Sequence, residues 1–113
     1  MKHLAATNQI LAAAALGEAA PDDAGDEAGP ENIPTKAEIL SNLNDSFAHL
    51  SKAIDAIGRG DIRTNSSPIS PLKKSVVNRE SLVVEAVVHS FDHYGQMVEY
   101  FRMSGIVSPA SLA

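Results

Sequence analysis

Apolar side chains recur every three or four residues between positions 39 and 57, and this spacing constrains the fold more than any other feature. The series is Ile39, Leu43, Phe47, Leu50, Ile54 and Ile57. Such spacing puts all of these side chains along one face of an α-helix about five turns long. Thr35 and Glu38, placed just before it, predict a capping box. Gly58 and Gly60 predict the end of the helix.

Two further stretches also predict helices. Residues 2–16 are rich in Ala and Leu, which are strong helix formers, and Gly17 predicts the C-terminal stop of this helix. A long helix is expected from about residue 76 or 79 to residue 103, with Gly105 just beyond its end. Its pairs of adjacent valines fit helical turns better than strand alternation. The sequence therefore predicts an all-α, up-down helical bundle with three main helices.

One domain is expected to cover residues 1–113, because this length lies near the common domain size. Residues 18–34 are acidic and contain three prolines, so they are expected to form a flexible, solvated linker. Residues 61–75 contain two Ser-Pro steps and predict a second loop. Residues 104–113 are expected to form a C-terminal tail.

Composition narrows the classes of partner and site. The chain has no cysteine, which excludes disulfides, thiolate metal sites and a catalytic cysteine, so a metal must be held by His, Asp or Glu. The net charge is −5, and no basic cluster is larger than Lys73-Lys74. We therefore expect neither nucleic acid nor a membrane as a partner. No apolar run approaches the ~20 residues that a transmembrane helix needs.

A cytoplasmic location is expected, because a chain without cysteine fits a reducing compartment. The alternative is export. Met1-Lys2-His3 and the apolar run at residues 10–16 have a weak signal-peptide pattern, and cleavage near residue 20 would remove His3. Asn8 and Gln9 interrupt that apolar run, which favours a helix of the mature fold.

The last predicted helix carries the strongest chemical signal. His89 and His93 are four residues apart, so they lie about 40° apart on the helix and one turn apart in height. Both imidazoles can therefore reach one point about 2 Å from each ring nitrogen, which is the metal–nitrogen distance. The acidic residues of this helix lie opposite, toward water, whereas the histidines face the bundle together with a wide apolar strip.

Two histidines hold a metal poorly, and a third ligand is needed from another helix. The candidates are His3 and His49. His49 lies beside the apolar stripe of the second helix, which suits a partly buried, hydrogen-bonded histidine. Periodicity alone does not choose between these two candidates.

The C-terminal part of the chain resembles the DinB family. Two runs of residues match the last helix and the tail of that family. They are His89-Ser90-Phe91-Asp92-His93-Tyr94-Gly95-Gln96 and Tyr100-Phe101-Arg102-Met103-Ser104-Gly105-Ile106-Val107-Ser108-Pro109. Ser108 departs from it, because a proline is usual there. His3-Leu4-Ala5 resembles the start of the family's second helix, and Thr35-Lys36-Ala37-Glu38 and Ser46-Phe47 resemble its third.

The resemblance implies metal ligands at His3, His89 and His93, and none at His49. It implies a bundle of the four-helix type that often forms dimers, with zinc or nickel as the divalent metal. The family's first helix has no counterpart before His3, so the chain looks N-terminally shortened. Apolar faces would then be exposed, and we expect either a homodimer or another form of self-association, or marginal stability.

Three neutral imidazoles leave coordination positions open, which is typical of catalytic metal sites. The resemblance implies a metal-dependent enzyme, a transferase acting on a low-molecular-weight thiol or a hydrolase, with an unknown small-molecule substrate. Gln96 and Tyr100 lie beyond His93 on the same strip and are possible substrate contacts, although packing or hydrogen bonding inside the bundle is the favoured interpretation for each. No general base is evident. The alternative is therefore a non-catalytic helical interaction module, either metal-stabilised or truncated.

Overall fold

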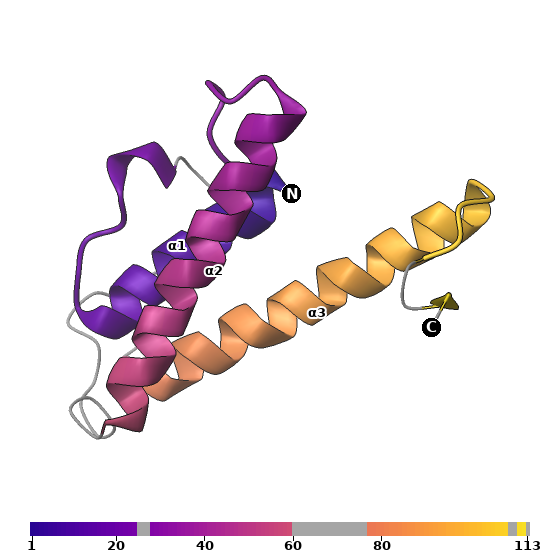
Figure 1. The fold of residues 1–113 in the computed structure, drawn as a ribbon. Helices are drawn as coiled ribbons and strands as arrows, with labels where there is room; N and C mark the ends of the chain where they lie inside the picture. Colours follow the sequence, from indigo (N-terminus) through magenta and orange to yellow (C-terminus); the bar gives the residue numbers. More distant parts are fainter. Residues whose placement is uncertain (25–27, 60–76, 109–110, 113) are drawn as a thin grey trace.

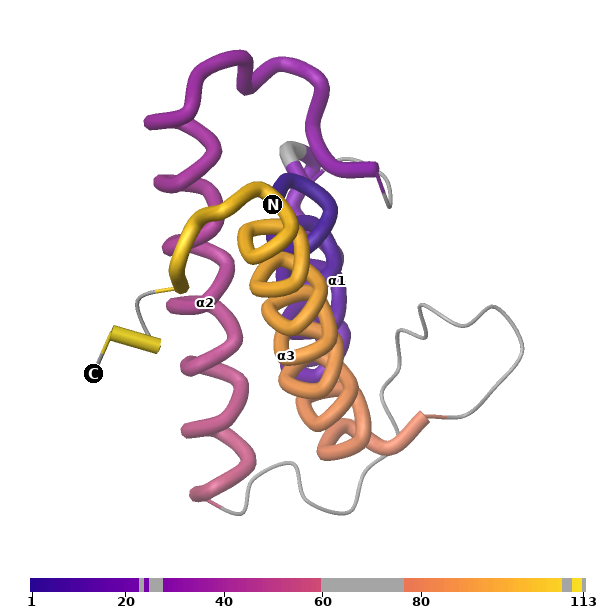
Figure 2. Tube along the Cα trace, turned by 90° about the vertical axis from the view of Figure 1, so that its right-hand side faces the viewer, coloured from indigo at the N-terminus to yellow at the C-terminus, as the bar shows by residue number. Residues whose placement is uncertain are grey.

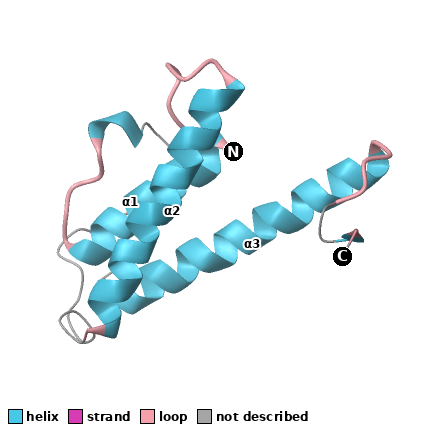
Figure 3. Cartoon of the chain, in the orientation of Figure 1, coloured by secondary structure: helices cyan, strands magenta, loops and turns pink. Residues whose placement is uncertain are grey.

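The computed structural model describes residues 1–24, 28–59, 77–108 and 111–112. It contains three α-helices, α1 (Lys2–Leu16), α2 (Lys36–Gly58) and α3 (Arg79–Met103), and one turn of 3-10 helix, η1 (Asp22–Ala24). The all-α prediction is confirmed, and Figure 3 shows no strand in the described part of the chain. The loop predicted at residues 61–75 lies outside the described residues.

Helix α1 is the centre of the arrangement. Helices α2 and α3 each pack mainly against α1 and touch each other little. Asn8 of α1 contacts Ser46 of α2, whereas His3 of α1 contacts His89 of α3 and Ala15 contacts Arg79. Helix α3 therefore runs antiparallel to α1, and Figure 1 shows that α2 and α3 diverge from the end where α2 ends and α3 begins.

The helix ends lie close to where local signals predict them. The Thr35 hydroxyl accepts a hydrogen bond from the Glu38 backbone N–H at 3.3 Å, and Glu38 Oε2 accepts one from the Thr35 backbone N–H at 3.0 Å. This is the predicted capping box. Gly17 ends α1 with φ of 79°, a left-handed conformation that glycine adopts without steric cost. At the start of α3, the Asn78 side chain accepts from the Glu80 backbone N–H at 2.9 Å.

The core is small and rich in alanine. Alanines of α1 let the other two helices approach closely, and each of the three helices contributes at least one larger side chain. The buried cluster consists of Leu11, Ala12, Ala14, Ala15, Leu50, Ala53, Leu82, Val83 and Ala86. It lies toward the C-terminal ends of α1 and α2 and the start of α3, which is where α2 and α3 come together in Figure 1. Figure 2 shows α3 in front of α1, with α2 beside them. This cluster fixes the angle at which α3 crosses α1.

The linker between α1 and α2 packs on the start of α1. Ala24 is 3% exposed, and Gly29 adopts a positive φ of 89°. A Cβ on Gly29 would lie 2.6 Å from the Lys2 carbonyl carbon, so only glycine allows this close approach. The contact holds the linker against the turn of α1 that carries His3.

Only part of the wide apolar strip expected on α3 is covered. Leu82, Val83 and Ala86 are buried, whereas Phe91 is 72% and Phe101 is 41% exposed. The reason is geometric, because α1 and α2 cover α3 chiefly along its first turns. Most of the remaining apolar side chains of α3 are exposed, whereas Met97 and Val98 are half-buried.

Candidate metal centre

The structure brings His3, His89 and His93 together, with one ring nitrogen of each within 4.8 Å of the other two. His3 is carried by the first turn of α1, and the other two residues lie one turn apart on α3. The antiparallel packing of α1 on α3 therefore supplies the third imidazole that the His89–His93 pair lacks. All three residues are half-buried, so the cluster retains access to solvent.

The nitrogen atoms are spaced for a small cation. The Nε2 atom of His89 lies 3.1 Å from Nε2 of His3 and 2.9 Å from Nε2 of His93. A cation about 2.0–2.1 Å from each nitrogen requires nitrogen–nitrogen distances of roughly 2.9–3.4 Å, for angles between the right angle and the tetrahedral angle. The ring centroids are 4.5–5.1 Å apart and the rings are tilted or edge-on, so the nitrogens meet without parallel stacking.

The donor set itself favours a metal. The His89 Nε2 atom faces two other ring nitrogens, and a neutral imidazole nitrogen has either one proton or one lone pair for hydrogen bonding. His89 Nε2 can therefore make a good hydrogen bond with only one of its two neighbouring ring nitrogens. A divalent cation uses all three lone pairs at once, and imidazole is a preferred ligand of zinc, nickel and related metals. The residues present thus fit a metal ion.

Electrostatics also favour the neutral, ligating form of His93. The pKa of His93 lies below its ordinary value, first because burial penalises the charged ring and then because His89 and His3 repel the added positive charge. The Asp92 carboxylate acts in the opposite direction and the N-terminal amine adds to the lowering. Since a histidine must be unprotonated to bind a metal, the lowered pKa extends the pH range in which His93 can do so.

A buried polar contact between the helices lies close to the cluster. The side-chain amide of Asn8, which is fully buried, donates to the Ser46 hydroxyl of α2 at 3.3 Å. Its carbonyl oxygen lies 3.4 Å from the hydroxyl of Ser90 in α3, the residue after His89. Ser46 is buried too and donates to the Leu43 carbonyl at 2.7 Å. Asn8 therefore joins all three helices at a defined register, and sequence reasoning had treated it only as a break in an apolar run.

His49 lies outside the cluster. Its Nδ1 atom is 2.5 Å from Gln9 Oε1, and its Nε2 atom is 3.7 Å from the Glu18 carboxylate, which also pairs with Lys52. The side chain of His49 is 16% exposed. These contacts match the partly buried, hydrogen-bonded histidine that was one of the two sequence interpretations, and they leave the ligand role to His3.

The two possible substrate contacts lie further along α3. The Gln96 amide donates to the Asp92 carboxylate at 2.8 Å, and Tyr100 is 66% exposed. Neither residue is packed inside the bundle. Their role toward a substrate stays a prediction.

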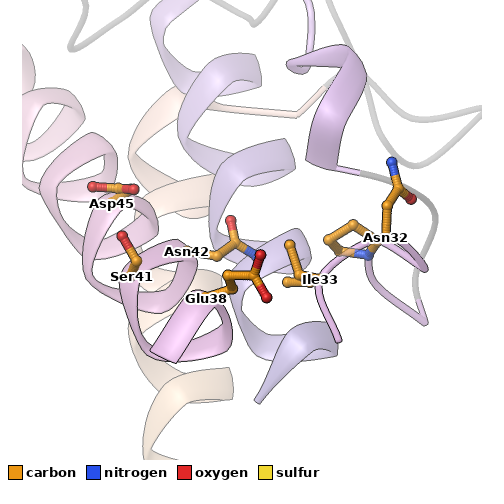
Figure 4. Close-up of a pocket in the computed structure, with 7 residues that line it drawn as sticks. Asn32, Ile33, Glu38, Ser41, Asn42 and Asp45 are labelled. Atoms are coloured by element: carbon orange, nitrogen blue, oxygen red, sulfur yellow. The ribbon is translucent and has the colours of Figure 1, made fainter. Parts of the chain in front are cut away.

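A polar cavity of about 290 Å³ lies between the linker and the first turns of α2 (Figure 4). It is lined by Pro30, Asn32, Ile33, Glu38, Ser41, Asn42 and Asp45. The pKa of Glu38 is lowered, first by the hydrogen bond from the Thr35 side chain and then by the one from the Thr35 backbone. Glu38 is therefore occupied in capping α2, and the cavity contains none of the three clustered histidines.

Three comparisons place the chain among known proteins. A family model described as the DinB superfamily matches residues 1–97. Comparisons with curated proteins and with solved structures gave no match. Within the described residues, no helix is both long enough and apolar enough to cross a membrane.

Proposed function

The chain belongs to the DinB superfamily, and we propose that it binds one divalent metal ion through His3, His89 and His93. Zinc and nickel are the expected ions, because both accept imidazole ligands readily. The convergence of three ring nitrogens from two helices is the observation that carries this proposal. Membership of a superfamily that commonly binds metals supports it.

A site of this kind is suited to catalysis more than to structure alone. Structural zinc sites are closed by four protein ligands, whereas catalytic sites have three and leave a position for water or substrate. A metal bound there would lower the pKa of a bound water or thiol. The three imidazoles would hold it in place, and the Asn8 contact would keep α1 and α3 in the register that makes them converge.

We propose transfer of a low-molecular-weight thiol to a small electrophile as the reaction class. A metal held by the three imidazoles would lower the pKa of a thiol, so that the thiol would need no separate protein base. This suits a sequence in which no general base is evident, and the Asp92 carboxylate, next to His93 on α3, accepts a hydrogen bond from Gln96. Gln96 and Tyr100 would contact the substrate beyond His93.

Metal analysis of the native protein tests the first step. We expect about one equivalent of metal per chain in the wild type and a loss of it in the His89→Ala variant, while His49→Ala retains it. Turnover of a thiol with an electrophile by the metal-loaded protein tests the second step. Metal binding without turnover would favour the alternative, a metal-stabilised interaction module. Equal metal contents of wild type and His89→Ala would contradict the proposed site.

A further inference from the structure

The linker between α1 and α2 is held at both of its ends. Where it begins, the Glu18 backbone N–H donates to the Ala13 carbonyl of α1 at 2.8 Å, and the Glu18 carboxylate pairs with Lys52 of α2 at 3.2 Å. Where it ends, Thr35 forms the capping box of α2 with Glu38. These contacts limit how far the residues between them can move away from α1 and α2.

Two points along the linker contact α1. Ala24 is buried in η1, which packs against α1. Gly29 is buried as well, and a Cβ there would lie 2.6 Å from the carbonyl carbon of Lys2 and 2.7 Å from its carbonyl oxygen. The linker backbone therefore lies directly on the backbone of Lys2, the residue before His3.

The first turn of α1 carries few features of its own that would fix it. Met1 is the N-cap, and its side chain has no oxygen to accept from the first backbone N–H groups. The turn also contains no Asp or Glu to interact with the helix dipole. Buried side chains begin only at Leu4, one residue after His3. Because uncapped helix ends fray, His3 lies in the part of α1 that depends most on contacts from elsewhere.

We propose that the linker holds the first turn of α1 in place and so positions His3 for metal binding, with Gly29 as the positioning residue. This inference rests on the proposed metal centre. His89 and His93 converge because they lie one turn apart on α3, whereas Nε2 of His3 reaches Nε2 of His89, at 3.1 Å, from the end of another helix. Residues that orient a metal ligand typically change metal affinity by about tenfold to hundredfold when they are replaced.

Replacing Gly29 tests this role. Gly29→Ala places a methyl group where the Lys2 backbone lies, so the linker and the first turn must separate, and zinc affinity in a calorimetric titration should fall by about tenfold. Gly105→Ala is the matched control. Gly105 has a similar positive φ of 74°, but a Cβ there would meet nothing within 4 Å among the described residues, so zinc affinity should stay at the wild-type value. Gly29→Ala with wild-type zinc affinity would overturn the proposal.

A second variant guards against misfolding, which circular dichroism would detect. If Gly29→Ala does not fold, Ala24→Glu disturbs the other buried contact of the linker on α1, and we expect a similar fall in zinc affinity. Wild-type affinity in a folded Ala24→Glu protein would then overturn the proposal.

The same substitution in a His3→Ala background separates positioning from a general loss of stability. If Gly29 acts through His3, Gly29→Ala should have no further effect on the weaker zinc binding that His89 and His93 retain. A tenfold fall in both backgrounds would overturn the proposal, because the effect would not pass through His3.

Hydrogen exchange of the metal-free protein tests the linker contact without the metal centre. The Ala5 backbone N–H donates to the Met1 carbonyl at 3.0 Å and closes the first turn of α1. In Gly29→Ala this amide should exchange at least about tenfold faster than in the wild type or in Gly105→Ala. Equal exchange would overturn the proposal even if zinc binds. A wild type that binds no zinc would contradict the metal centre, and the exchange of Ala5 would still decide whether the linker holds the turn that carries His3.

Discussion

The two sides of helix α3 differ in how completely the rest of the chain covers them. On the side toward α1, His89 and His93 meet His3, and Ser90 lies beside Asn8. On the other side, Val84, Phe91 and Phe101 are exposed. Both sides have a helical repeat in the sequence, yet among the described residues only one of them is covered by another helix. A periodic face therefore predicts that something packs there, but does not say whether the chain itself supplies it.

The largest expected difference between the two sides is the loss of unfolding free energy when an apolar side chain is shortened to alanine. Leu82 is 2% exposed within the core cluster, so Leu82→Ala should lower the free energy of unfolding by about 2–5 kcal/mol. Val84, two residues on, is 55% exposed, and Val84→Ala should cost no more than about 0.5 kcal/mol. Denaturant unfolding at low protein concentration measures both. Equal losses of unfolding free energy in the two variants would show that the exposed side of α3 is also covered within one chain.

Local signals explain why most of the fold could be predicted from the sequence. Helix ends depend on residues a few positions apart, such as Thr35 with Glu38, and on Gly17 with its positive φ. The His89–His93 spacing is local as well. The third ligand could not be identified from local spacing, because its position depends on how α1 packs on α3. His3 and His49 were equivalent candidates until the family resemblance distinguished them. The same limitation hid Asn8, whose contacts lie 38 and 82 residues away.

Loss of one imidazole should affect only the covered side of α3. His89→Ala removes the ring whose Nε2 faces both others, and we expect metal affinity to fall at least about hundredfold, equivalent to about 2.7 kcal/mol. Isothermal titration with zinc measures this, with His49→Ala as the matched control. If the His89→Ala protein bound zinc as tightly as the wild type, the covered side of α3 would not be a metal-binding side.

A lower pH should weaken metal binding on the covered side of α3. Protons compete with the metal for each imidazole. An imidazole of ordinary pKa loses about threefold of its unprotonated form between pH 7 and pH 6, so the zinc affinity of a site made of three imidazoles should fall by about tenfold to thirtyfold over this range. His93 should keep its ligating, unprotonated form to a lower pH than an ordinary histidine, because burial, His89, His3 and the N-terminal amine lower its pKa more than Asp92 raises it. Zinc titrations across this range check the slope.

The smallest effect concerns the polar contact that keeps the covered side in register. Asn8→Ala leaves the buried Ser46 hydroxyl without its donor, and Ser46→Ala leaves the Asn8 amide without its acceptor, so each should cost about 1–3 kcal/mol. Because both variants break the same hydrogen bond, the double variant should be less destabilised than the two costs added together, by about 1 kcal/mol. Purely additive costs would mean that this contact contributes nothing beyond packing. If the contact also sets the register of α1 on α3, Asn8→Ala should weaken zinc binding more than Ser46→Ala does, since only Asn8 lies on the helix that carries His3 and also reaches Ser90.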